Sequence, residues 1–158
     1  MSTPADLRVY KLPSTCIDSD HPEIQALVQR LVNPADTALD TAIAIYYWVR
    51  DEIRYNPYAL SNEITGFRAS HTLQLGEGWC VPKAILLAAM CRACGIPARL
   101  GFADVRNHLS TANMREVMET DVFYFHGYTV IHLEQQWVKA TPAFNAELCD
   151  RFGLHALE

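Results

Sequence analysis

Residues 76–100 read GEGWCVPKAILLAAMCRACGIPARL, and this stretch decides the expected fold. The run from Cys80 to Cys94 is apolar on nearly all sides, which predicts a helix in the middle of a domain. Gly95 and Pro97 end that helix, because glycine is favoured just after a helix and proline cannot continue one. The sequence therefore places a cysteine at the first turn of a central helix.

Helices are predicted before this stretch. Asp20, with Pro22 and Glu23 after it, is typical of a helix start, and residues 33–36 (NPAD) end that helix. A second helix is predicted from about Thr37 to Ile53. Its expected apolar stripe consists of Leu39, Ala42, Ile43, Tyr46, Val49 and Ile53.

Strands are predicted after the central helix. Residues 98–105 and 121–134 read as strands, and residues 137–145 follow the second one closely enough to form a hairpin. A short surface helix is expected over 111–120, and residues 55–78 read as a long loop. Helices first and antiparallel strands later indicate an α+β fold.

Composition limits the class of protein. A chain of 158 residues, half of them apolar, is expected to form one domain, over 1–158. The net charge of −5 gives no basic surface for nucleic acid, and no apolar run is long enough to cross a membrane. The first residues lack the pattern of a signal peptide, so we expect a cytoplasmic protein. Its five cysteines are expected to be reduced thiols.

Cys80 has two interpretations. Free backbone N–H groups and the helix dipole at a helix start favour negative charge, so they lower a thiol pKa and can stabilise an oxyanion. Gly76 and Gly78 allow a close backbone approach, and Pro82 is tolerated in the first turn. On composition alone, however, a free cysteine is more often a buried core residue.

A nucleophilic cysteine needs a base, so the histidines decide between the two interpretations. His126 lies inside an apolar predicted strand, where a histidine needs a partner or a function. His132 lies nearer the end of that strand, and His71 and His108 lie in predicted loops. His126 is therefore the best candidate for the base.

Three stretches together resemble one family. They read YYWVRDEIRYNPY, GWCVPKAILLAAMCRACGIPARLGFADV and FHGYTVIHLEQQWVKATP, in this order. The set is similar to the motifs of the bacterial transglutaminase-like superfamily, whose core is related to papain-type cysteine proteases. The resemblance implies a papain-like α+β core with N-terminal helices, a buried central cysteine helix and an antiparallel sheet.

The resemblance also implies roles for individual residues. Cys80 would be the nucleophile, His126 its base, and a residue after the next strand would orient the imidazole. That last position is commonly aspartate in the family, but here it is Thr141 in KATPA. Asn145 is a second candidate for it. A third is an acidic group elsewhere, because related sequences continue past the position of Glu158 and the chain is expected to be truncated there.

Several neighbouring side chains have weaker interpretations. Trp79 and Tyr128 are expected to bind substrate, with core packing as the alternative for Trp79. Tyr55 and Tyr58 are expected at the edge of the site. Lys83 is expected to reach solvent. Cys91 and Cys94 form a C-x-x-C pair at the wrong end of a helix for redox chemistry, so core packing is preferred.

These features lead to two hypotheses. In the first, Cys80 and His126 transfer an acyl group from an amide of a peptide or protein to water or to an amine. In the second, motivated by Thr141, the domain is catalytically weak or inactive and binds peptides or proteins. No metal or cofactor is expected, and the oligomeric state is left open.

Overall fold

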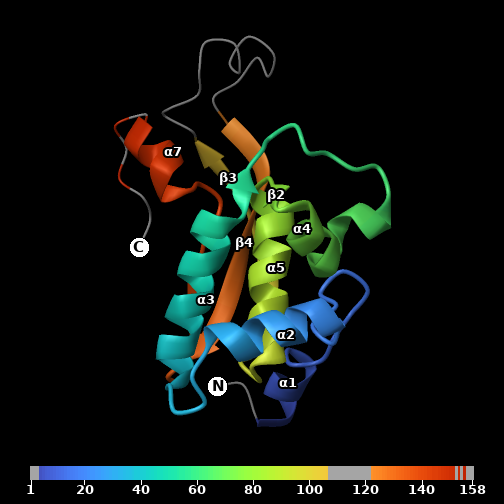
Figure 1. Cartoon of the computed structure of the whole chain (residues 1–158), viewed down its shortest axis with the longest axis vertical. Coiled ribbons are helices and arrows are strands. Elements are labelled where there is room, and N and C mark those ends of the chain that lie inside the picture. Colours follow the sequence, from blue (N-terminus) through green and yellow to red (C-terminus); the bar gives the residue numbers. More distant parts are fainter. Residues whose placement is uncertain (1–3, 107–121, 152, 154, 156–158) are drawn as a thin grey trace.

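The computed structural model describes residues 4–106, 122–151, 153 and 155. Helix α5 (Cys80–Ala93) runs through the centre of the molecule. Helices α2 (Pro22–Leu31), α3 (Ala38–Glu52) and α4 (Ala69–Leu75) cover one side of it, and a sheet covers the other (Figure 1). Every residue of α5 from Val81 to Cys91 is buried. The predicted α+β fold around a central cysteine helix is confirmed.

The sheet has three antiparallel strands in the order β3 (Ala98–Arg106), β4 (Val122–Leu133) and β5 (Gln136–Ala140). Glu134 and Gln135 have positive φ, as a tight two-residue hairpin turn requires. The predicted strands and hairpin are confirmed, although the last strand begins one residue before the predicted stretch of 137–145 and ends at Ala140. In the middle of β4 the Thr129 hydroxyl donates to the carbonyl of Ala84 on α5, at 2.8 Å.

Helix α3 begins as predicted and buries part of the predicted apolar stripe. Thr37 and Asp40 form a reciprocal capping box at its start. Leu39 and Ile43 of the predicted stripe are exposed, at 38% and 45%, whereas Ile45 is fully buried. The predicted stripe is therefore confirmed at Ala42, Val49 and Ile53 and wrong at Leu39 and Ile43. Helix α3 carries apolar residues on several faces, and contact with α5 selects the one that is buried.

The predicted loop over 55–78 is largely ordered structure. It contains the short helix η1 (Ile64–Phe67) and helix α4, and strand β1 (Arg54–Tyr55) pairs in parallel with β2 (Glu77–Gly78). The Asp18 carboxylate holds the start of α4 because it accepts from the Ser70 N–H and hydroxyl, at 3.1 and 2.5 Å. These partners lie 52 residues apart, so local sequence does not reveal the helix start.

Smaller differences concern the chain ends. The N-cap of α2 is His21 instead of Asp20, and helices α1 (Pro4–Val9) and α7 (Ala146–Arg151) were not predicted. The helix expected over 111–120 and His108 lie outside the described residues. Over the parts of the chain that are described, no helix has both the length and the apolar character that a membrane span needs. The expected cytoplasmic location stays a prediction.

Candidate active site

Cys80 is the first residue of α5 and is half-buried. The N–H of Lys83 already donates to the carbonyl of Trp79, at 3.2 Å, and Pro82 has no N–H. The N–H groups of Cys80 and Val81 are therefore the donors left at this helix end, and both interact with the Cys80 thiol. The cysteine lies where backbone dipoles favour negative charge.

Strand β4 packs directly on this first turn at Gly127. A Cβ on Gly127 would lie 2.7 Å from Val81 Cγ2 and 3.0 Å from Val81 Cα, so only glycine allows the approach. The N–H of Gly127 also lies close enough to the Cys80 thiol to lower its pKa. The structure thus brings the His126–Gly127 segment to Cys80, although the two residues are far apart in sequence.

Burial keeps both candidate reacting groups neutral at rest. It raises the pKa of the Cys80 thiol, and the three N–H donors only partly oppose this effect. Burial also lowers the pKa of His126. The backbone N–H groups at the helix start lower the thiol pKa as predicted, but loss of solvent outweighs them. A neutral imidazole and a neutral thiol suit a general base better than a preformed ion pair.

The imidazole of His126 has no side-chain partner within the described ranges. No hydrogen bond joins it to Cys80 Sγ, and none joins it to a carboxylate, hydroxyl or amide there. Hydrogen bonds between catalytic groups are often long before substrate binds.

Thr141 directly follows β5 and is half-buried. Its carbonyl accepts a hydrogen bond from the Tyr46 hydroxyl on α3, at 3.1 Å. This bond ties the backbone of Thr141 to α3. The proposed role of its side chain toward His126 stays a prediction.

Asn145, the second candidate, is engaged elsewhere. Its side-chain N–H group donates to the carbonyls of Arg50 and Ile53, the latter at 2.8 Å. Its Oδ1 accepts from the Tyr55 N–H at 2.7 Å. Asn145 thus closes the end of α3 and holds β1, and no bond to His126 is among its contacts.

Lys83 does not reach solvent, so that prediction was wrong. Its side chain is fully buried, and Nζ donates to the carbonyls of Arg50 and Ile53, at 2.9 and 2.6 Å. Burial lowers the pKa of Lys83 to about 7, although the charge of Asp51 opposes the shift. No face of this part of α5 is exposed to solvent, so the Lys83 side chain stays in the core, where two backbone carbonyls accept its hydrogen bonds.

The two residues expected to bind substrate lie in different places. Trp79 immediately precedes Cys80, is half-buried, and packs edge-on against Phe67 with ring centroids 6.3 Å apart. Tyr128 packs across Gly101 of β3, with Lys139 of β5 5.4 Å from its ring centre. The structure brings Trp79 to Cys80 but places Tyr128 over neighbouring strands.

Tyr55 lies closer to Cys80 than its place in the sequence indicated. β1 pairs with β2 so that Tyr55 lies opposite Gly78, two residues before Cys80. Burial, together with the charge of Cys80, raises the pKa of Tyr55 to about 12. Tyr58, expected beside it, is 83% exposed. Only the parallel pairing of β1 and β2, invisible in local sequence, distinguishes the two tyrosines.

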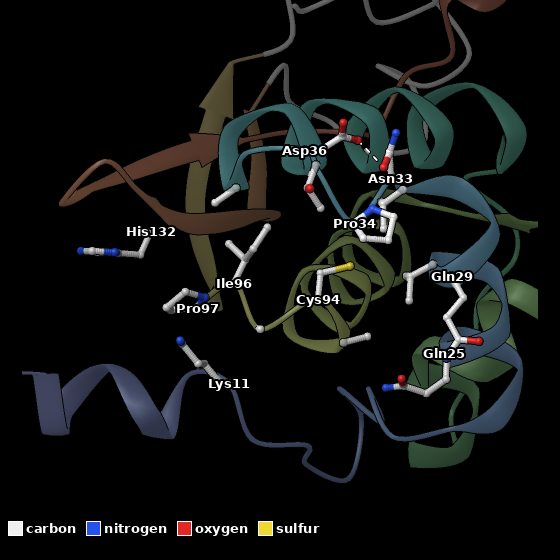
Figure 2. Close-up of a pocket in the computed structure, with 16 residues that line it drawn as sticks. Lys11, Gln25, Gln29, Asn33, Pro34, Asp36, Cys94, Ile96, Pro97 and His132 are labelled. Carbon is white, nitrogen blue, oxygen red and sulfur yellow. Dashed lines mark hydrogen bonds between the residues drawn. The ribbon is translucent and has the colours of Figure 1, made fainter.

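A cavity of about 550 Å³ lies at the other end of α5 (Figure 2). Cys94, Gln29 and Lys11 line it, with His132 at its edge. Figure 2 shows the His132 ring directed away from Cys94, and that ring packs edge-on against Trp137, with centroids 5.1 Å apart. In the described part of the chain, no three His, Cys, Asp or Glu side chains gather as metal ligands. The cavity and the Cys80 region are separate features.

A cysteine at the start of a central helix, with a histidine strand packed on its first turn, defines a papain-like α+β domain. The sequence model of the transglutaminase-like superfamily matches residues 25–142. The chain belongs to the transglutaminase-like superfamily.

Solved structures have the same fold. A candidate cysteine protease from Cytophaga hutchinsonii is 21% identical with a TM-score of 0.70, and the match covers 89% of this chain and 43% of that one. The periplasmic domain of TgpA from Pseudomonas aeruginosa is 17% identical with a TM-score of 0.62, covering 89% and 48%. A candidate protease from Parabacteroides distasonis is 16% identical with a TM-score of 0.52, covering 75% and 22%. The chain therefore spans less than half the length of these structures, and no curated protein matches it.

Proposed function

We propose that the protein is a cysteine-dependent acyl-transfer enzyme that acts on amide bonds of peptides or proteins. The observation that carries the proposal is the contact of Gly127 with Val81, which brings the His126 segment to the first turn of α5. This contact brings together the chemical groups that attack on a carbonyl requires: a thiol as nucleophile, backbone N–H groups for the oxyanion, and a residue with an imidazole as base.

In the proposed reaction the neutral imidazole of His126 takes the proton of the Cys80 thiol, and the sulfur attacks the carbonyl carbon. The N–H groups of Cys80 and Val81 stabilise the oxyanion of the tetrahedral intermediate. The C–N bond then breaks, and the leaving amine takes the proton from His126. The resulting thioester on Cys80 is cleaved by water or by a second amine, which regenerates the thiol.

Water is the acceptor that we favour. Two of the structures with this fold are described as candidate proteases. We therefore propose hydrolysis of a peptide bond, with amine transfer as the competing outcome.

Acylation by p-nitrophenyl acetate tests the proposal without a known substrate. The acetyl group would pass from the phenolate oxygen to Cys80 Sγ with release of p-nitrophenol, and mass spectrometry would locate the thioester. Cys80→Ala should abolish the burst of p-nitrophenol, whereas Cys94→Ala, which removes the half-buried thiol directly after α5, should leave it intact. Labelling of Cys94 or Cys16 in preference to Cys80 would contradict the assignment.

Two assays with casein then distinguish water from an amine as the acyl acceptor. Fluorescein-labelled casein reports hydrolysis, and unlabelled casein with monodansylcadaverine reports amine transfer. Release of fluorescent peptides that depends on Cys80 supports a protease, and incorporation of the amine supports a transglutaminase.

The second candidate function is a catalytically weak or inactive domain that binds peptides. It is favoured by the absence, among the described residues, of a side-chain partner for His126. A chain of this kind would show no burst with p-nitrophenyl acetate. Saturable binding of unlabelled casein peptides without cleavage would support this alternative.

A further inference from the structure

The short pairing of β1 with β2 gives the side chain of Tyr55 a defined direction. The Arg54 guanidinium bonds to the Glu77 carboxylate across the pair, so these two side chains share one face of it. Neighbouring residues of a strand point to opposite faces. The side chain of Tyr55 therefore leaves the pair on the other face, which it shares with Gly78, its partner in the register.

That face is turned toward the first turn of α5. A Cβ added to Gly78 would lie 3.1 Å from Pro82 Cβ and 3.7 Å from Lys83 Cγ, so the helix start covers this face. Cys80 begins that turn. The charge of Cys80 also contributes to the raised pKa of Tyr55, and a Coulomb energy falls with distance. Strand geometry and electrostatics therefore agree that the phenol lies near the thiol.

Three contacts hold Tyr55 in this place. Its N–H donates to Asn145 Oδ1 at 2.7 Å. Its ring packs on Phe144, with ring centroids 4.8 Å apart. The N–H of the next residue, Asn56, donates to the Gly78 carbonyl at 3.0 Å and keeps the two strands in register. Because Tyr55 is already ordered, a contact between it and a ligand would cost little further side-chain entropy.

The hydroxyl of Tyr55, in contrast, is not used by the fold. In the described part of the chain no hydrogen bond involves it, whereas the Tyr46 hydroxyl is bonded to the Thr141 carbonyl at 3.1 Å. No fully buried side-chain oxygen or nitrogen there lacks a partner, so the Tyr55 hydroxyl oxygen is in contact with solvent. A half-buried ring with an open polar end suits recognition of a ligand.

The acceptor for this hydroxyl is expected in the substrate. The pKa of Tyr55, raised to about 12, keeps the phenol protonated at neutral pH, so it can donate. The reacting carbonyl oxygen has two lone pairs, and in the proposed reaction the N–H groups of Cys80 and Val81 donate to it. A peptide offers a further carbonyl at each residue, about 3.3–3.6 Å along an extended chain. The nearest free acceptor is therefore a neighbouring backbone carbonyl.

We propose that Tyr55 is a peptide-binding residue of the candidate active site, whose hydroxyl donates to a backbone carbonyl of the substrate next to the amide that is attacked. The inference rests on the proposed acyl transfer, because it places the peptide of that reaction beside Cys80. The contact favours peptides over small esters and amides, which have no second carbonyl to accept the hydrogen bond.

Binding of fluorescein-labelled casein to Cys80→Ala tests this contact without turnover. Tyr55→Phe, added to Cys80→Ala, removes only the hydroxyl and should raise the Kd about 2- to 10-fold, the usual loss for one neutral hydrogen bond. Fluorescence anisotropy gives both values of Kd. Tyr10→Phe in the same background is the matched control and should leave the Kd unchanged. Tyr10 is also half-buried against an aromatic ring, that of Trp137, but its carbonyl bonds to Ala98, beyond the other end of α5.

Urea unfolding of the same variants separates a lost contact from a general loss of structure. Because the Tyr55 hydroxyl has no hydrogen-bond partner among the described residues, Tyr55→Phe should keep the free energy of unfolding of its background. Tyr46→Phe, which breaks the bond to the Thr141 carbonyl, should lower it. The two tyrosines thus distinguish a hydroxyl that the fold uses from one that it leaves for a ligand.

The possible outcomes are distinct. A higher Kd for casein in Tyr55→Phe with unchanged stability supports the contact. An unchanged Kd, an equal rise in Tyr10→Phe, or no binding of casein to Cys80→Ala overturns it. A higher Kd with a matching loss of stability shows a structural role and also overturns it. Acylation by p-nitrophenyl acetate is a separate measurement: if the unaltered chain is not acylated at Cys80, the proposed function fails, and the casein Kd still decides the contact.

Discussion

The two ends of α5 each carry a half-buried cysteine whose thiol pKa is raised by burial. At the first end, the N–H groups of Cys80 and Val81 have no intrahelical partners, and the N–H of Gly127 joins them. At the last end, the N–H of Cys94 is used within the helix, since it donates to the carbonyl of Met90 at 3.2 Å. Burial alone does not distinguish the two thiols, because it acts in the same direction on both.

What distinguishes them is how each end responds to negative charge. Backbone donors at a helix start stabilise a thiolate or an oxyanion once it forms, and the carbonyls at a helix end oppose it. The cavity in Figure 2 lies at the end where Cys94 is, so the hollow part of the molecule and the part suited to nucleophilic chemistry do not coincide. The candidate site at Cys80 is therefore indicated by the direction of the helix and not by the cavity.

The largest expected effect concerns the histidines, because β4 carries one toward each end of α5. His126→Ala should slow acylation of Cys80 by p-nitrophenyl acetate about 10²- to 10⁴-fold, the usual contribution of a general base. His132→Ala removes a ring that packs on Trp137 and should leave the rate unchanged. Stopped-flow measurement of p-nitrophenol release gives both rates. Similar losses in the two variants would remove the distinction between the ends.

A smaller effect is expected where β4 contacts the helix start. Gly127→Ala should lower the free energy of unfolding by about 1–3 kcal/mol, because the added methyl group overlaps Val81. Gly101→Ala is the control, since its Cβ would lie 2.4 Å from the Tyr128 ring and away from α5. Urea unfolding should show a loss of stability in both variants.

Acylation should then separate the two glycine variants. Only Gly127→Ala displaces the strand segment at Cys80, so only it should slow acylation by p-nitrophenyl acetate. Slowing in both to the same degree would mean that general loss of stability, and not the contact with Val81, controls the site.

The smallest effect concerns the charge buried one turn from Cys80. The folded-state pKa of Lys83, about 7, lies below its ordinary value of 10.5, so the unfolded chain binds more protons between these values. Stability therefore rises with pH, and from pH 7 to 8.5 Lys83 should add about 1–2 kcal/mol to the free energy of unfolding. Urea unfolding across this range should show a smaller rise in Lys83→Met.

That variant should fold, because Asn145 still donates to the carbonyls of Arg50 and Ile53. The range from pH 7 to 8.5 was chosen to keep other titrations small. The lowered pKa of His126 affects stability mainly below its ordinary value of 6.5, and the raised pKa of the Cys80 thiol affects it mainly above 9.0. Arg92→Met in the last turn of α5 is the comparison: it removes a half-buried cation that donates to the Ala98 carbonyl at 2.9 Å. The same change in pH dependence in both variants would contradict the assignment to Lys83.

Local sequence was sufficient to predict an element where its residue pattern is compatible with only one structure. The all-round apolar run of α5 could only be a central helix, and Gly95 adopts the left-handed conformation that ends it. The same reasoning should have placed Lys83 in the core. A lysine on a helix without a wet face has no route to solvent, and this signal was in the sequence.

Local sequence was insufficient where distant contacts decide. The buried face of α3 depends on which of its apolar faces meets α5, and the start of α4 depends on Asp18. The place of Tyr55 depends on the pairing of β1 with β2, and the use of Asn145 depends on the end of α3. Phe125 has a φ of 58° without being glycine, so local sequence does not predict the irregularity of β4 there.

Two side chains, Lys83 and Asn145, donate to the carbonyls at the end of α3, and this has a consequence for the design of shorter fragments. The family match stops at residue 142, yet Asn145, three positions later, shares the carbonyls of Arg50 and Ile53 with the buried Lys83. Cys149 of α7, only 4% exposed, lies further still. A fragment trimmed to the family boundary would leave those carbonyls to a single lysine and free the Tyr55 N–H. The contacts that hold the end of α3 therefore extend past the residues that the family model matches.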